Sequence, residues 1–220
     1  MNTSQGLRES KKEQTRTAIA RAALALFVER GFERVSIAEI ASAAGVSKMT
    51  VFNYFPAKED MFFAFTHGTL PDFAGAVAAL PARGSVVDAV HHFVRSEFER
   101  RAEWTGLHEG AEKFTKMIRD SPTLMAGYAR QWRALESSLI DAVSHAADVP
   151  RASIPNESPT RDAVRVRTVV AQILAVVQTL VLVNESRQLG GMDGVRATKL
   201  CLLECDDAFE LLATGLKSYP

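Results

Sequence analysis

The stretch "SIAEIASAAGVSKMTVFNYF", residues 36–55, contains two short helical patterns on either side of one glycine. Ser36 and Glu39 have the spacing of a capping box, in which the serine and glutamate side chains each bind backbone at a helix start. Gly45 ends the first pattern, because glycine adopts the left-handed backbone conformation that a tight turn requires. Ser47 has the position of an N-cap for the second helix. Two short helices joined in this way predict a helix-turn-helix.

The helix after Ser47 is predicted to have a buried and an exposed side. At about 100° per residue, Val51 and Phe55 lie about 40° apart and mark the side that packs on the preceding helix. The other side chains face away from this core or flank it, and these are Lys48, Met49, Thr50, Phe52, Asn53 and Tyr54. Lysine can donate to guanine, asparagine can bind adenine through two hydrogen bonds, and threonine or methionine can contact the thymine methyl group. We therefore expect this face to bind the major groove of double-stranded DNA.

Residues at the predicted helix starts are candidates for phosphate contacts, and these are Ser36, Ser47 and Lys58. Unpaired backbone N–H groups and the positive end of the helix dipole favour an anion at such positions. The Tyr54 hydroxyl can also reach a phosphate. The alternative interpretation is a helical hairpin whose polar face is only solvated. Because the serine caps, the glycine turn and the Lys/Thr/Asn face occur together, we favour the DNA-binding interpretation.

The charge of the chain is uneven. Its 220 residues carry no net charge, with 47% hydrophobic residues. Residues 1–58 hold nine Lys/Arg and five Asp/Glu, a balance of +4, so the remainder carries −4. This distribution is typical of a basic DNA-binding part on an acidic body, whereas zero net charge argues against non-specific DNA binding. The sequence shows no catalytic triad, metal cluster or phosphate loop, so we expect neither an enzyme nor a bound cofactor or metal.

The pattern along the whole chain predicts an all-α protein. Ser10 and Glu13 have a second capping-box spacing and predict a first helix over 10–30. Further helices are expected over 36–44, 47–55, 58–80, 84–103, 107–119, 122–147, 161–187 and 193–216, with a loop over 148–160. We predict a flexible arm over 1–10, a three-helix DNA-binding domain over 11–56 and a second helical domain over 57–220. With two cysteines and no signal segment, a cytoplasmic location is expected.

The segment "RTAIARAALALFVERGFERVSIAEIASAAGVSKMTVFNYFPAKEDMF", residues 16–62, resembles the N-terminal domain of TetR-family transcriptional regulators. This resemblance implies a helix-turn-helix head on a helical body that binds a small effector and dimerises. It implies a repressor that an apolar or aromatic effector releases from a palindromic operator. The alternative is an activator, or a regulator without a small-molecule effector. Phe52 stands where the family often has tyrosine, so a phosphate contact by a hydroxyl is missing there, and Tyr54 retains one.

The last two predicted helices carry apolar residues at seven-residue spacing. These predict a homodimer interface, which the resemblance also implies, and they are Val166, Ile173, Leu180, Val195, Leu202 and Phe209. The alternative is that these side chains form intramolecular core. The run "TVVAQILAVVQTLVLV", residues 168–183, contains two glutamines and is short for a membrane span, so we interpret it as a buried helix.

The middle of the chain supplies candidate effector-binding residues. The resemblance implies a ligand cavity there, and large aromatic residues with polar neighbours suit an apolar or aromatic effector. The candidates are Trp104, His108, Phe114, Trp132 and Gln178. The alternative is that the aromatic residues are ordinary helical core. Cys201 and Cys205 lie one turn apart, and we interpret them as small buried residues rather than as a redox or metal site.

Overall fold

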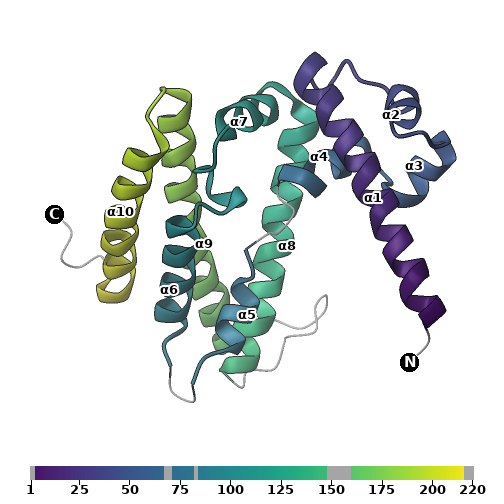
Figure 1. Ribbon diagram of the computed structural model, residues 1–220. Coiled ribbons are helices and arrows are strands. Elements are labelled where there is room, and N and C mark those ends of the chain that lie inside the picture. The colour runs from purple at the N-terminus through teal and green to yellow at the C-terminus, as the bar shows by residue number, and fades with distance from the viewer. Residues whose placement is uncertain (1–2, 67–70, 82–83, 148–159, 216–220) are drawn as a thin grey trace. The chain divides into compact units, whose positions relative to one another are not determined.

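The computed structural model describes residues 3–66, 71–81, 84–147 and 160–215, and these residues form helices and turns with no strand (Figure 1). The chain divides into two compact units. The first comprises residues 1–68 and 113–128, and the second comprises residues 69–112 and 129–220. The fold class predicted from the sequence, all-α, is confirmed. The units differ from the predicted boundary at Pro56, because α4 and a later segment belong with the N-terminal helices.

The first unit contains α1 (Thr3–Arg30), α2 (Ile37–Ala43), α3 (Lys48–Tyr54), α4 (Lys58–Thr66), most of α7 (Ala111–Asp120) and the start of α8 (Pro122–Ala146). Its core is rich in phenylalanine. The ring centroids of Phe27 and Phe32 lie 5.0 Å apart, and Phe62 lies 6.4 Å from the first and 6.2 Å from the second. All three rings are buried. Tilted aromatic pairs at these distances add to the free energy of burial, so these rings join α1, the following turn and α4.

The connection from α2 to α3 is a helix C-cap followed directly by a helix N-cap. Gly45 has φ +67°, and its N–H donates to Ser42 O at 3.2 Å. The N–H of Val46 donates to Ala41 O at 2.9 Å. These two bonds form a Schellman motif, which satisfies the last carbonyl groups of α2. The predicted glycine turn is therefore present, and it directs the chain into α3 within a few residues.

Two predicted helix boundaries are wrong. Helix α1 begins at Thr3, so residues 3–10 are helical where an arm was predicted, and Ser10 lies inside the helix rather than at its cap. The helix predicted over 58–80 is two helices, because Pro71 lacks the N–H that a continuous helix needs. Asp72 caps the second of these, α5 (Phe73–Ala78), by accepting a 2.8 Å bond from the Gly75 N–H. Most of the predicted loop over 148–160 lies outside the described residues.

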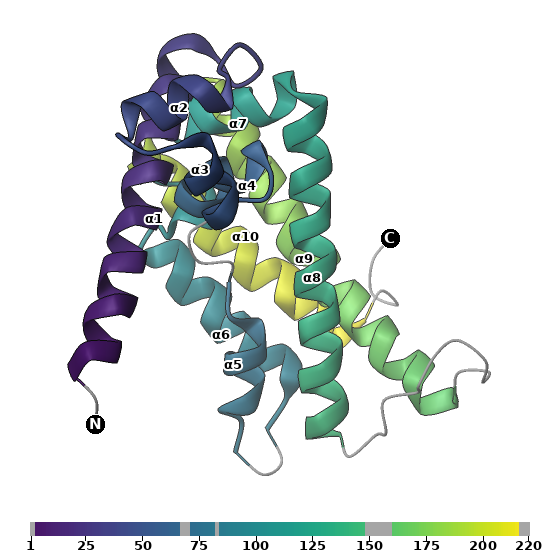
Figure 2. The same ribbon diagram turned by 90° about the vertical axis from the view of Figure 1, so that its right-hand side faces the viewer.

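The second unit contains α5, α6 (Val86–Glu99), the short helix η1 (Glu103–Thr105), the rest of α8, α9 (Arg161–Leu189) and α10 (Gly194–Thr214). Helices α6, α9 and α10 lie side by side (Figures 1 and 2). Their apolar side chains form one core that includes Phe98, Ile173 and Phe209. Arg95 of α6 binds Asp206 of α10 at 2.7 Å, so an ion pair at the edge of this core joins two of the helices.

Helix α9 is the longest apolar helix of the second unit. Within the described part of the chain it alone passes a length and hydropathy test for a membrane span, and 39% of its most apolar window is buried. Core helices of water-soluble proteins pass the same test. Val170, Ile173 and Val177 of α9 are fully buried among side chains of the second unit. Packing against its own chain therefore accounts for one side of this helix.

Candidate nucleic-acid interface

Helix α3 buries one side and exposes the other, as predicted. Val51 and Phe55 are 0% and 1% exposed, and they pack in the core of the first unit. On the other side, Met49 is 69% exposed and Phe52 is 48% exposed. Lys48 and Asn53 are also exposed, while Thr50 and Tyr54 are half-buried. One short helix thus brings a cation, an amide and two large apolar groups together on a solvent-facing surface.

The start of α3 is held by a hydroxyl pair. Ser47 Oγ accepts a 3.0 Å bond from the Thr50 N–H, and it lies 2.8 Å from Thr50 Oγ1. A side-chain cap of this kind satisfies one of the free N–H groups of the first turn. The Thr50 hydroxyl therefore has a partner within the helix start.

The start of α2 already holds a carboxylate. The predicted capping box is present, since Ser36 N–H donates to Glu39 Oε2 at 2.9 Å and Ser36 Oγ donates to the same oxygen at 2.7 Å. Arg30 of α1 donates to the other Glu39 oxygen at 3.1 Å. The Ser36 hydroxyl, its N–H and then Arg30 lower the pKa of Glu39. An anion thus occupies the place that was predicted for a phosphate, which weakens the prediction for Ser36.

Lys58 does not extend toward solvent as a phosphate-binding side chain would. Its ammonium donates to Phe32 O at 2.9 Å and to Val35 O at 3.1 Å. It also lies 4.3 Å from the centroid of the Phe32 ring. These contacts join the start of α4 to the turn between α1 and α2. The side chain of Lys58 has a structural position that its place at a helix start did not predict.

One candidate residue was missed. The Arg16 guanidinium lies 4.9 Å from the centroid of the Phe55 ring, and the Arg16 side chain is 44% exposed. This contact places a cation from α1 beside the end of α3, where it can add to the positive charge of the surface. The sequence shows the charge of Arg16 but not its contact with Phe55, because 39 positions separate the two residues (55 − 16).

The five predicted effector-binding residues divide between the two units, with Phe114 in the first and the other four in the second. Trp104 is buried, and its indole N–H donates to Glu97 Oε2 at 2.7 Å. Phe114 belongs to the first unit, where its ring lies 6.2 Å from Phe62. Trp132 and His108 are half-buried in the second unit, and Gln178 is exposed on α9. Phe114 lies in a different unit from the other candidates because α7 and α8 each contribute residues to both units, and the effector-binding role of the five residues stays a prediction.

The predicted dimer stripe is largely intramolecular core. Four of its members are at most 6% exposed within the single chain, and these are Val166, Ile173, Leu180 and Phe209. Leu202 is half-buried against the same core, and Val195 is 54% exposed. The alternative that the sequence left open, intramolecular packing, is correct for the four buried residues. Seven-residue spacing marks a stripe on a helix, but it does not say which neighbour covers the stripe.

A second stripe on α9 remains exposed, and it was missed. Its members follow the same helical spacing and are exposed, and they are Val164, Thr168, Ala171, Ala175, Gln178 and Leu182. Leu182 is 57% exposed, and Leu203 of the neighbouring α10 is 64% exposed. Small and apolar residues that recur at i, i+4 and i+7 are the signal that could have identified this face.

Both cysteines are buried in the second unit, as expected. Burial raises the pKa of the Cys201 thiol to about 11 and that of the Cys205 thiol to about 12. Thiols with raised pKa values react slowly, because the thiolate is the reactive form. No group of three metal-ligating side chains is found in the part of the chain that the structure describes.

The two capped helices, their glycine turn and the solvent-facing side of α3 define a helix-turn-helix protein. The family model described as "Bacterial regulatory proteins, tetR family" matches residues 19–65. The HTH-type transcriptional regulator TcmR of Streptomyces glaucescens is 28% identical over 139 residues. This alignment covers 61% of the chain and 61% of TcmR, so the chain spans about three fifths of the length of this relative.

Two solved structures have the same fold over nearly the whole chain. A protein of Mesorhizobium loti MAFF303099 assigned to the TetR family has a TM-score of 0.55 at 18% identity, covering 92% of this chain and 96% of its own. The TetR-family repressor FadR of Thermus thermophilus, in complex with lauroyl-CoA, has a TM-score of 0.52 at 21% identity, covering 93% and 96%. Residues 19–65 are therefore similar to TetR-family transcriptional regulators, and the chain has the fold of solved TetR-family structures.

Proposed function

We propose that the chain is a sequence-specific, dimeric repressor that acts in the cytoplasm and binds a palindromic operator through α3. A small effector releases it from the DNA. The observation that carries the proposal is the solvent-facing side of α3, where Lys48, Met49 and Asn53 are exposed and Val51 is buried. Lysine and asparagine are suited to guanine and adenine, and the methionine side chain suits a thymine methyl group.

The contacts around α3 support a rigid reading helix. Ser47 holds its first turn, and Phe55 anchors its end in the core. A helix held at both ends loses little conformational freedom on binding, so more of the contact energy contributes to affinity. Arg16 adds a cation beside Phe55, and cations near the groove bind phosphate and position the helix. For Lys58 we propose a structural role in place of the phosphate contact.

The dimer part of the proposal rests on the exposed faces of α9 and α10. Leu182, Val195 and Leu203 are each more than half exposed, and exposed apolar groups on adjacent helices are typical of a protein–protein interface. One short reading helix contacts few base pairs, whereas two related by a two-fold axis contact two half-sites. We therefore place the interface on these outward faces and not on the buried stripe that includes Ile173.

The effector part of the proposal is supported by the fold. A small-molecule ligand, lauroyl-CoA, is present in the Thermus FadR structure, which has the same fold. Release requires the effector to bind the DNA-free state more tightly than the DNA-bound state, because a ligand with equal affinity for both shifts nothing. We retain Trp104, His108 and Trp132 as candidate contacts in the second unit, and we drop Phe114 from that set.

The proposal is tested by measuring affinity for the DNA upstream of the protein's own gene in a mobility-shift assay against random duplex of equal length. We expect tighter binding to the upstream DNA. Asn53→Ala and Lys48→Ala should each cost about 1–3 kcal/mol on a cognate site and relax its base preference. Both side chains are exposed, so neither substitution should change the free energy of unfolding by more than about 0.5 kcal/mol.

Arg119→Ala is the matched control, because Arg119 is an exposed cation on α7 rather than on α3. It should leave base preference unchanged. Equal affinity for upstream and random DNA contradicts a sequence-specific regulator. A change of base preference in Arg119→Ala, with none in Asn53→Ala, contradicts the assignment of the reading face to α3.

A further inference from the structure

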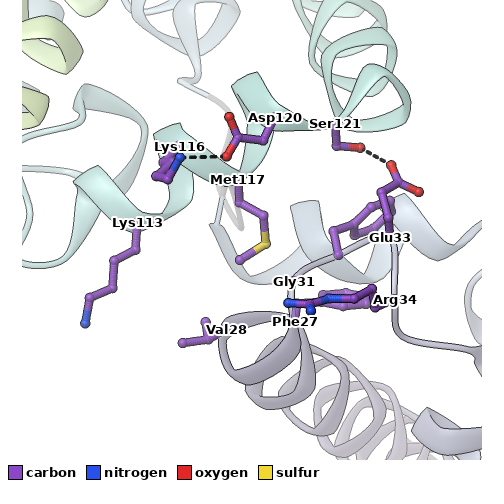
Figure 3. Close-up of a pocket in the computed structure, with 11 residues that line it drawn as sticks. Phe27, Val28, Gly31, Glu33, Arg34, Lys113, Lys116, Met117, Asp120 and Ser121 are labelled. Atoms are coloured by element: carbon purple, nitrogen blue, oxygen red, sulfur yellow. Dashed lines mark hydrogen bonds and ion pairs between the residues drawn. The ribbon is translucent and has the colours of Figure 1, made fainter.

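The first unit contains a cavity that none of the predicted DNA-binding or effector-binding residues lines. It has a volume of about 340 Å³ and lies between the end of α1, the turn over 31–34 and the C-terminal half of α7 (Figure 3). Small-molecule sites begin at about 300 Å³. All of its lining residues belong to the first unit, so the cavity is a property of that unit alone.

The wall of the cavity is apolar. Phe27 and Phe32, whose ring centroids are 5.0 Å apart, line it together with Val28. Met117 extends from α7 toward Gly31 at the end of α1 (Figure 3). An unbranched thioether side chain adjusts to differently shaped apolar groups and makes favourable contacts with aromatic rings. An apolar ring of a ligand would therefore find phenylalanine on one side and a flexible sulfur-containing side chain on the other.

The carboxylates at the rim of the cavity already have partners. Asp120 accepts a 2.8 Å bond from the Lys116 ammonium, and Glu33 accepts a 2.5 Å bond from the Ser121 hydroxyl (Figure 3). Each negative charge is therefore compensated or hydrogen-bonded within the rim. An incoming cation would have to compete with these bonds.

The cations at the rim have N–H groups for which no acceptor is found among the described residues. Lys113 is exposed, and no bond to its ammonium is found within the described residues. Arg34 uses its Nε to donate to Arg30 O at 2.6 Å, and among the described residues no acceptor is found for the two terminal nitrogens of its guanidinium. An anion at the rim would receive charge-assisted hydrogen bonds, which are stronger than neutral ones. The rim therefore complements a carboxylate.

We propose that this cavity binds a small amphipathic carboxylate. Its apolar body lies between Phe27, Phe32 and Met117, and its carboxylate binds Lys113 and Arg34. Its lining residues belong to the first unit, whereas candidate effector residues such as Trp104 belong to the second. It would give the DNA-binding unit a ligand site of its own.

The position of the cavity connects a ligand to the start of the helix-turn-helix. Phe32 lines the cavity, and its carbonyl accepts the bond from Lys58. Val35, which provides the second acceptor for Lys58, directly precedes the capping residue Ser36. A ligand that shifts this turn would shift α2. That consequence rests on the proposed DNA-binding function, whereas the binding of the carboxylate does not.

The test is a calorimetric titration of the full chain, without DNA, with naphthylacetate and with its uncharged isostere naphthylacetamide. We expect saturable binding of one naphthylacetate per chain. The amide should bind at least about tenfold more weakly, because it cannot form the charge-assisted bonds. Absence of saturable binding of the acid, or equal affinity for acid and amide, would overturn the proposal.

Three variants locate the site. Lys113→Gln should weaken the acid about tenfold and leave the amide unchanged. Val28→Trp should abolish both, because Val28 lines the cavity at a position that is 48% exposed and can accept a larger side chain. Lys12→Gln changes an exposed lysine outside the cavity and should change neither. Undiminished binding in Lys113→Gln and Val28→Trp would overturn the proposal.

A second measurement does not depend on any variant. With labelled methionine methyl groups, the NMR signal of Met117 should shift on addition of naphthylacetate, while that of the exposed Met49 on α3 should not. Binding that leaves the Met117 signal unmoved places the ligand elsewhere and overturns the proposal. Because no DNA is present, this result is independent of whether α3 reads an operator.

Discussion

Helical periodicity predicts which side of α3 and which side of α9 packs within the chain. The structure agrees with this prediction for α3 and differs from it for α9. In α3, Val51 is 0% exposed and Met49 is 69% exposed, as predicted. In α9, the stripe predicted to meet a partner subunit is buried in the second unit, with Ile173 at 0% exposure, while Leu182 is 57% exposed.

The difference follows from the length and composition of the two helices. Helix α3 has seven residues, and signals at both ends set its orientation, Ser47 before it and the buried Phe55 after it. Helix α9 has 29 residues and is apolar on most sides. A strict seven-residue repeat drifts by about 20° per repeat on a straight α-helix. A stripe read from spacing alone therefore leaves open which side packs within the chain and which side stays exposed.

The largest expected effect distinguishes the two sides of α9. Ile173→Ala should lower the free energy of unfolding by about 2–5 kcal/mol, because it removes a fully buried side chain from the core of the second unit. This loss should not depend on protein concentration. It is measured by chemical denaturation at two concentrations that differ a hundredfold.

Leu182→Ala is the matched substitution on the exposed side of the same helix. Exposed substitutions change the stability of a monomer by no more than about 0.5 kcal/mol. If Leu182 lies in the dimer interface, its effect should grow with protein concentration, since association stabilises the folded state by mass action. Sedimentation should show a higher dimer dissociation constant in this variant. A stable monomer at micromolar concentration in the wild type would contradict the dimer.

Local signals explain what could be predicted from the sequence. The Ser36–Glu39 box, Gly45 and Ser47 each act within a few residues, so their spacing identified α2, the turn and α3. The same signature at Ser10 and Glu13 was misleading, because this spacing also occurs within a helix and says nothing about residues before it. Helix α1 begins at Thr3.

Contacts between distant segments could not be predicted. Lys58 binds carbonyl groups 26 and 23 residues earlier, in the turn between α1 and α2. No local sequence pattern predicts a contact between Lys58 and this turn. The cavity between α1 and α7 likewise requires residues about 85 positions apart to be neighbours, for example Phe32 and Met117 (117 − 32). The division of Phe114 from the other effector candidates was not visible in the sequence either, because helices α7 and α8 each contribute residues to both units.

A smaller effect separates the structural lysine of the first unit from its DNA-reading lysine. Lys58→Met should lower the free energy of unfolding by about 1.5–3 kcal/mol, the range for hydrogen bonds to charged groups, because it removes the donor to Phe32 O and Val35 O. Lys48→Met should change the free energy of unfolding by no more than about 0.5 kcal/mol and should weaken DNA binding. Denaturation and mobility-shift titrations on both variants check this pair. If Lys58→Met lost DNA affinity without losing stability, the original prediction that Lys58 binds a phosphate would be correct.

The smallest expected effect compares the two serine caps of the first unit. Ser36→Ala and Ser47→Ala should each cost about 1 kcal/mol at neutral pH. Only Ser36 is bonded to a carboxylate, that of Glu39, whose pKa is lowered in the folded state by those bonds. A lowered pKa contributes stability above the unfolded-state pKa, and this contribution is lost as the pH falls through the folded-state pKa.

The cost of Ser36→Ala should therefore shrink as the pH is lowered from neutral to below about 4, the unfolded-state range of a glutamate. The cost of Ser47→Ala should stay constant, because the third residue of α3 is Thr50, which does not titrate. Glu39→Gln should remove the pH dependence of the Ser36→Ala cost. Denaturation at a series of pH values measures these costs. The two serine variants are compared with the wild type, and Ser36→Ala combined with Glu39→Gln is compared with Glu39→Gln alone. A Ser47→Ala cost that falls in parallel with that of Ser36→Ala would mean that acid acts on the whole first unit and not on the capping box of α2.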